Sequence, residues 1–287
     1  MATYRALMLG AHSPLAPAVS RALEHAQIVL RLAHPWGKPG GFESAPPHIE
    51  RVILDPLDPT SLQDALRACN FIIRLDEPSE SLARDVQEAR ALARAIRDSD
   101  VERLLLVSCA SMLGAGEPSW LKGPDRGYTF GRGSEIMDHR YMLELEWLRF
   151  TADALDVIRL YPGYCVDPDA PLPLPPLASE LSPDHPVNAV STREVARAAL
   201  AALQHGRAGA AYAIGGVNTS IQELAALLGV QAAHRLPWLG QSKSEHPRFR
   251  DALLGAGHLE SASAWKSLGV ARPIADLEML LESAAPE

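Results

Sequence analysis

The chain has 287 residues, of which 47% are hydrophobic and 22% charged, a balance typical of a soluble globular protein that can bury a large core. A net charge of −8 without a basic cluster argues against a nucleic-acid or anionic-membrane partner, and three widely separated cysteines predict neither a disulfide framework nor a metal site. We recognise no signal peptide and no apolar run of membrane-spanning length, so we expect a cytoplasmic protein.

Short apolar runs alternate with helical patterns along most of the chain. The clearest helical pattern spans 81–99, where apolar side chains recur on one stripe between charged ones. Such alternation predicts an α/β fold with a doubly wound, Rossmann-like parallel sheet covered by helices on both faces. The runs expected to form strands are 4–9, 27–33, 51–54, 70–75, 103–108, 156–161 and 210–214.

The loop after the first predicted strand contains one glycine of a possible phosphate cradle. Gly10 suits the tight turn and Ala16 the close approach of helix to strand, but Ser13 replaces the glycine that lets backbone approach a pyrophosphate. Ser13 and Pro14 also form a good helix start, with a hydroxyl N-cap and proline at the first helical position. A nucleotide cradle and a capped helix without a ligand are both open readings.

Two long segments interrupt the alternation. Residues 114–135 are rich in glycine and contain three aromatic side chains, which favours a lid over a substrate, although a solvated loop is the alternative. Residues 162–186 contain eight prolines. We therefore predict a Rossmann-like domain over 1–161. Residues 162–287 should mainly form a small C-terminal substrate lobe, except that 186–215 return to the main sheet. The lobe includes a Ser-x-x-Glu capping box at Ser220.

The order of these signals resembles the extended or atypical short-chain dehydrogenases/reductases, the NAD-dependent epimerase/dehydratase proteins. Each motif is degenerate, but their order extends over nearly the whole chain. The matching segments are 7-LMLGAHSPLA-16, 52-VILDPLDPTSLQDAL-66, 103-RLLLVSCASMLG-114, 157-VIRLYPGYCVDP-168, 190-VSTREVARAALAAL-203, 210-AAYAIGGVNTSIQELAALLG-229 and 259-LESASAWKSLG-269.

The resemblance implies a nicotinamide cofactor. The second predicted strand of this chain is not followed by the acidic residue that would hold an NAD ribose. Arg31, His34 and Lys38 lie there instead and would suit a 2′-phosphate, so we expect NADP rather than NAD. The alternative is that these residues form a solvated basic edge. Asp76 and Glu77 would repel a pyrophosphate unless a cation compensates. The implied cofactor-binding residues are Gly10, His12, Ser13, Pro14, Leu15, Arg31, His34, Asp55, Pro56, Leu75 and Asp76.

The catalytic residues of that family are only partly matched. The family's serine falls on Cys109, with Ser108 and Ser111 beside it, and a buried inert cysteine is the alternative reading. Tyr141 is the only tyrosine in 134–150, and Leu145 stands where the family has lysine. A tyrosine without that cation is a poor base at neutral pH. Asp138, His139 and Arg140 are further polar candidates.

The resemblance implies an enzyme that reduces a ketone, or otherwise acts on a cyclic hydroxy-carbonyl molecule, with NADPH. Its partners would be a small-molecule substrate and a second copy in a homodimer, with no nucleic acid and no membrane. The alternative is a member without redox chemistry, either a cofactor-free isomerase or cyclase or a nucleotide-sensing or structural protein.

Overall fold

The computed structural model divides into two compact units. The first comprises 1–107, 138–159 and 199–211, and the second comprises 108–137, 160–198 and 212–287. The structure describes residues 4–35, 49–75, 79, 81–113, 135–150, 155–167, 182–228, 257–271 and 276–282. The predicted lid over 114–135, apart from Glu135, and most of the proline-rich segment lie outside the described residues, and so do Lys38, Asp76 and Glu77.

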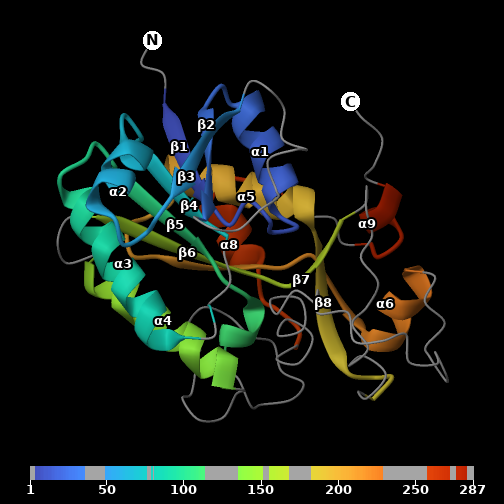
Figure 1. The fold of residues 1–287 in the computed structure, drawn as a ribbon. Coiled ribbons are helices and arrows are strands. Elements are labelled where there is room, and N and C mark those ends of the chain that lie inside the picture. Colours follow the sequence, from blue (N-terminus) through green and yellow to red (C-terminus); the bar gives the residue numbers. More distant parts are fainter. Residues whose placement is uncertain are drawn as a thin grey trace. The chain divides into compact units, whose positions relative to one another are not determined.

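A seven-stranded sheet contains all seven predicted strands, in the order β3-β2-β1-β4-β5-β6-β9 (Figure 1). The registers from β3 through β5 are parallel, as the buried apolar runs predicted. The doubly wound, Rossmann-like α/β fold is therefore confirmed. The strands are β1 Arg5–Leu9, β2 Val29–Pro35, β3 Glu50–Leu54, β4 Phe71–Arg74, β5 Arg103–Val107, β6 Asp156–Pro162 and β9 Ala211–Ile214.

Helices cover both faces of the sheet in the first unit. One face packs against α2 (Pro59–Leu66), α3 (Leu82–Arg97) and α4 (Glu135–Arg149) through a single apolar cluster. Behind the other face lie α1 (Ala16–His25) and the second half of α5 (Thr192–His205) (Figure 1). Burying the apolar stripe of each helix in this way supplies most of the stability that short helices lack in isolation.

Local signals explain where two of these helices begin. The Asp58 carboxylate accepts hydrogen bonds from the N–H groups of Thr60 and Ser61, so α2 starts at Pro59 with a satisfied first turn. The Ser81 hydroxyl accepts from the Arg84 N–H in the same way at the start of α3. The predicted helix over 81–99 is thus present as Leu82–Arg97, within two residues at each end.

The second unit contains a three-stranded sheet that the apolar pattern did not predict. Its order is β10-β8-β7, with β8 antiparallel to β10 and parallel to β7. Of the predicted return over 186–215, only β9 joins the seven-stranded sheet, because β8 pairs in the smaller one instead. The strands are β7 Tyr164–Val166, β8 Pro186–Ser191 and β10 Val217–Ser220. Whether 162–287 acts as a substrate lobe remains a prediction.

Asn188 helps to join three segments of the second unit. Its side-chain oxygen accepts the Gly216 N–H (3.1 Å) and its amide donates to the Asn218 side chain (2.7 Å). The Asn218 amide in turn exchanges hydrogen bonds with the backbone of Leu259. Asn188 is buried, so its polar groups need these partners to offset the loss of water.

The remaining described helices are short. The capping box predicted at Ser220 is present at the start of α6 (Ile221–Leu227), and Trp265 of α8 (Ala262–Ser267) donates its indole N–H to the Gly215 carbonyl. The other two are η1 Ala110–Met112 and α9 Met279–Glu282. None of the described helices combines the length and apolar character needed to cross a membrane.

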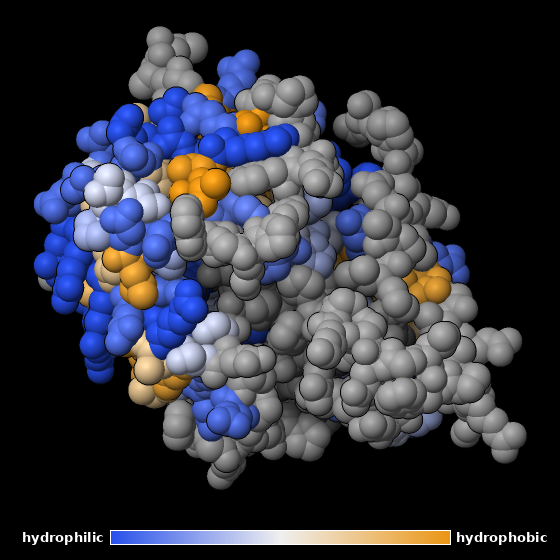
Figure 2. Space-filling model, viewed as in Figure 1, coloured by the Kyte–Doolittle hydropathy of each residue, from blue (hydrophilic) through white to orange (hydrophobic). Residues whose placement is uncertain are grey.

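The described surface over α2 and α3 is mainly hydrophilic, with separate apolar side chains between the charged ones (Figure 2). Large apolar side chains exposed in the described residues are Tyr4, Ile53, Leu57, Met142 and Met279. Single exposed side chains of this kind are ordinary on a globular protein.

We expect Gly163→Ala to destabilise the second unit. A Cβ added at Gly163 would lie 2.6 Å from the Asn188 carbonyl oxygen, which is backbone and can move only if β8 moves. Overpacking of this kind costs about 1–3 kcal/mol, measurable as a lower midpoint in urea. Gly209→Asn is the control, because Gly209 has open space and asparagine tolerates its φ of +72°. Equal midpoints for the two variants would contradict this account of the Asn188 contacts.

Candidate functional site

The carboxyl ends of the strands in the first unit form the expected ligand-binding edge. In a parallel sheet these ends lie at one edge, where doubly wound folds hold their ligands. Strands β1, β2 and β4 end at Leu9, Pro35 and Arg74. The Leu75 N–H donates to the Leu9 carbonyl (2.9 Å), so β1 and β4 stay joined at this edge.

The loop after β1 is a tight turn closed by its own hydrogen bonds. Gly10 has a φ of +83°, a value that glycine adopts without strain. The Ser13 N–H donates to the Gly10 carbonyl (2.8 Å), and the Ala16 N–H donates to the Ser13 carbonyl (2.9 Å). The Ser13 hydroxyl accepts from the Leu15 N–H (3.4 Å). The loop therefore turns within itself before the helix begins.

The predicted helix start at Ser13 and Pro14 is wrong by two residues. Helix α1 begins at Ala16 after Leu15, with Pro17 in its first turn, because Ser13 and Pro14 belong to the preceding turn. Ser13 is buried and its hydroxyl still occupies the Leu15 N–H, as a helix-capping serine would.

This loop matches a phosphate cradle in shape but offers few donors. Phosphates bind here through backbone N–H groups at the start of the helix. Proline has none, and the N–H groups of Ser13, Leu15 and Ala16 already have acceptors. Gly10 supplies the turn and Ala16 is small and buried, as a cradle requires. Ala11, ahead of the second turn, is a candidate to donate its N–H to a phosphate.

Arg31 does not support the predicted contact with a 2′-phosphate. Its guanidinium pairs with Glu50 (2.8 Å) and donates to the carbonyls of Asp64, Ala65 and Arg67 at the end of α2. It lies four residues before the end of β2, so it fastens α2 to the sheet instead of facing the carboxyl edge. His34, next to the last residue of β2, is the described candidate that remains for that contact.

Asp55 follows β3 at the same edge and is held by its neighbours. Its N–H donates to the Ser61 hydroxyl (2.9 Å) and its Oδ1 accepts the Leu57 N–H (3.0 Å). Oδ2 projects from the same fixed carboxylate. Pro56 lies within this turn, and Leu75, although placed at the edge, is fully buried. The roles predicted for Asp55 and Pro56 toward a nucleotide remain predictions.

In the second unit, three catalytic candidates follow β5 directly. Ser108, Cys109 and Ser111 are all buried, and the Ser108 N–H donates to the Leu160 carbonyl of β6 (2.8 Å). The Ser108 hydroxyl has no hydrogen-bond partner among the described residues. A buried hydroxyl without a partner is uncommon in proteins, and it is what a site designed to receive a ligand oxygen would show.

The fourth catalytic candidate lies on α4 in the first unit. Tyr141 is half-buried there. Two residues before it, His139 places Nε2 3.0 Å from the Asp85 carboxylate of α3. The sequence indicated His139 but not Asp85. The available signal was a carboxylate on the apolar stripe of α3, three residues after Leu82 and four before Ala89.

Buried charges accompany α4 along its length. The Arg74 guanidinium lies over the Trp147 ring, 5.2 Å from its centroid, in a cation–π contact. Glu146 accepts from Arg90 of α3 (2.6 Å) and from Arg149, and the Arg90 hydrogen bond holds the pKa of Glu146 below its usual value. Arg74 thus contacts the helix, and we assign it no role toward a ligand.

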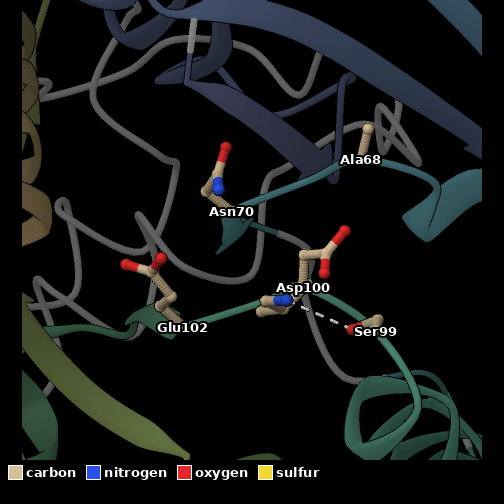
Figure 3. A pocket seen from close by; sticks show the side chains of 6 residues that line it. Ala68, Asn70, Ser99, Asp100 and Glu102 are labelled. Carbon is tan, nitrogen blue, oxygen red and sulfur yellow. Dashed lines mark hydrogen bonds between the residues drawn. The ribbon is translucent and has the colours of Figure 1, made fainter. Parts of the chain in front are cut away.

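A surface pocket in the first unit lies away from this edge. It is lined by residues that precede β4 and β5, at the amino ends of those strands, where the side chains of Asn70, Asp100 and Glu102 surround it (Figure 3). The Ser99 hydroxyl accepts the Val101 N–H (3.3 Å) on its wall. The pocket therefore does not coincide with the predicted ligand edge.

Comparison with solved structures assigns the fold. The chain is similar to a nucleoside-diphosphate-sugar epimerase from Pseudomonas aeruginosa (TM-score 0.73, 21% identity, covering 98% of this chain and 96% of the other). It is also similar to dTDP-glucose 4,6-dehydratase from Bacillus anthracis in complex with NAD (0.74, 13%, 98% and 95%) and to vestitone reductase from alfalfa (0.71, 16%, 98% and 96%). No protein-family model matches the sequence, and no curated protein matches it. The chain thus has the fold of the short-chain dehydrogenase/reductase and epimerase/dehydratase enzymes.

We expect Arg31→Ala to lower stability without changing the preference between NADPH and NADH. The substitution removes an ion pair and three hydrogen bonds to carbonyls, which together correspond to about 2–3 kcal/mol. Thermal unfolding and calorimetric titration with both cofactors measure the two effects. Arg51→Ala, an exposed charge on the neighbouring strand, is the control. A selective loss of NADPH affinity in Arg31→Ala would restore the original prediction.

Proposed function

We propose that this protein is an enzyme that reduces a ketone, or acts on a related cyclic hydroxy-carbonyl small molecule, with a nicotinamide dinucleotide. The observation that carries the proposal is the Ser108 hydroxyl, buried at the carboxyl end of β5 and without a partner in the described structure. The fold supports it, because the similar solved structures include a reductase, an epimerase and a dehydratase.

The residues that would hold the dinucleotide lie on the carboxyl edge of the first unit. The Gly10 turn would face the pyrophosphate, with a donor from Ala11, and Asp55 would accept from the adenine or its ribose. His34 would contact the 2′-phosphate of NADPH. The proposed preference for NADPH over NADH rests on His34, because Arg31 pairs with Glu50. When bound, such a cofactor supplies a hydride to a substrate carbon.

The Ser108 hydroxyl would orient the substrate by donating a hydrogen bond to its carbonyl oxygen. That bond strengthens as negative charge develops on the oxygen, so it stabilises the transition state more than the ground state. Cys109 is a weaker donor, and burial of its thiol favours a packing role.

A second candidate is an enzyme of the same fold that works without a dinucleotide, as an isomerase or cyclase. The Ser13 hydroxyl on the Leu15 N–H and the missing N–H of Pro14 favour this reading, because they remove donors that a pyrophosphate would need.

We expect Ser108→Ala to reduce turnover by about a hundredfold or more, the usual effect of removing one such donor, while unfolding stays unchanged or shifts upward. The unusual stability result follows because the substitution removes a buried hydroxyl that has no partner. Turnover of 2-hydroxycyclohexanone with NADPH and thermal unfolding measure both. Thr192→Val is the matched control, because Thr192 carries another buried hydroxyl without a partner in the described structure, and the variant should keep full turnover. A destabilised Ser108→Ala with full activity would contradict the assignment.

Ser13→Gly combined with Pro14→Ala distinguishes the two candidates. The change adds one N–H and releases that of Leu15, so dinucleotide binding should tighten about tenfold, near 1.4 kcal/mol. Calorimetric titration with NADPH and NADH measures it. Wild type should bind detectably under the first candidate, whereas only the variant binds under the second. Ser20→Ala, which changes α1 without altering its first-turn donors, should bind like wild type.

A further inference from the structure

The interface of α3 and α4 contains a buried carboxylate–imidazole pair that the proposed function has not used. His139 Nε2 lies 3.0 Å from Asp85 Oδ2, and their side chains are 11% and 4% exposed. The two atoms are close but not aligned for a full hydrogen bond. Such loose geometry is common in enzymes before the substrate arrives.

The pair lies at the ligand-binding edge of the sheet. Asp85 belongs to the first turn of α3, which starts directly after the segment that follows β4. His139 lies in the second turn of α4. Because α3 is the helix that follows β4 in the chain, its first turn is expected at the carboxyl edge of the sheet. A second contact between these helices, Arg90 with Glu146, lies farther from that edge, which shows that α3 and α4 run in the same direction.

The Asp85 carboxylate is held in place by the backbone. Its Oδ2 also accepts the Ser79 N–H (2.7 Å), so the segment after β4 orients the carboxylate toward His139. The carboxylate is almost fully shielded, and the imidazole is the member of the pair that keeps exposed surface. This division occurs in catalytic triads, where a buried carboxylate orients a reachable histidine.

His139 and Asp85 can supply the proton-exchange chemistry for which this sequence lacks the family's lysine. Leu145 stands four residues after Tyr141, where the family that the sequence resembles has lysine. Imidazole is the side chain that most often gives or takes a proton as a general acid or base in enzymes. The Arg90–Glu146 pair joins the same helices, but it cannot exchange protons with a substrate, because arginine does not release its proton.

We propose that His139, oriented by Asp85, exchanges the proton in this protein's reaction. The proposal rests on the proposed function. In the reduction, the substrate carbonyl carbon gains a C–H bond from the hydride, and the carbonyl π pair becomes a lone pair on oxygen. That oxygen then takes the proton from Nδ1 of the imidazolium, and the neutral imidazole regains a proton from water. Asp85 lies against Nε2, the other ring nitrogen, and is a positioning residue.

The test compares His139→Gln and Asp85→Asn with wild type. We expect turnover of 2-hydroxycyclohexanone with NADPH to fall at least a hundredfold in His139→Gln, and the pH–rate profile to lose one limb. Asp85→Asn should lower turnover by about tenfold or more and keep that limb of the pH–rate profile. NADPH affinity by calorimetry should stay within about twofold in both. Arg90→Gln is the matched control, because it removes a contact between the same two helices and should keep turnover and the pH limb.

A second measurement needs no substrate. Diethyl pyrocarbonate should modify His139 in the folded wild-type protein, as mass spectrometry of the peptide would show. An imidazole that reacts only after unfolding would overturn the proposal, and so would a His139→Gln variant with wild-type turnover or with losses matching Arg90→Gln. If the wild type binds no dinucleotide, the proposed function fails. The reaction of His139 with diethyl pyrocarbonate in the folded protein then decides this proposal.

Discussion

The parallel pairing of β3, β2, β1, β4 and β5 brings the carboxyl ends of these strands in the first unit to one edge. This geometric constraint places Gly10, which follows β1, and Asp55, which follows β3, at the same edge as His34, the residue before the last of β2. It also places Asp85 there, because α3 is the helix that follows β4, and His139 lies beside Asp85. The same constraint explains why the pocket around Asn70 and Glu102 is unrelated to the proposed site, since it lies at the amino ends of the strands.

Two kinds of polar group stand out among the described residues. Asn188 and Asn218 satisfy each other and the surrounding backbone, and Arg31 uses its guanidinium on Glu50 and three carbonyls. These groups hold segments together. The Ser108 hydroxyl and the His139 imidazole are incompletely matched in the described structure. A buried polar group that the fold does not satisfy costs stability, so its presence favours a role with a ligand.

The sequence predicted the architecture well because the signal for buried strands is local. Runs such as 103–108 and 156–161 are apolar over the length of a strand, which predicts burial from neighbouring residues alone. All seven predicted strands occur in the main sheet. The smaller sheet escaped prediction because β7 has three residues and β8 contains the polar Asn188, whose partners are distant in sequence. For Arg31, the sequence showed a cation near the end of a strand but not that Glu50 and the end of α2 would occupy it.

The central claim is that the loop after β1 receives a nicotinamide dinucleotide. Titration of the ¹⁵N-labelled protein with NADPH and with NADH, followed by amide NMR, tests it most directly. We expect saturable changes in the amide chemical shifts of Gly10, Ala11 and His12, and also of Asp55, whose N–H donates to the Ser61 hydroxyl at the same edge. The amide shifts of Asn70 and Glu102, at the opposite edge, should change little. Unchanged amides from Gly10 to His12 at saturating concentrations of both cofactors would contradict it.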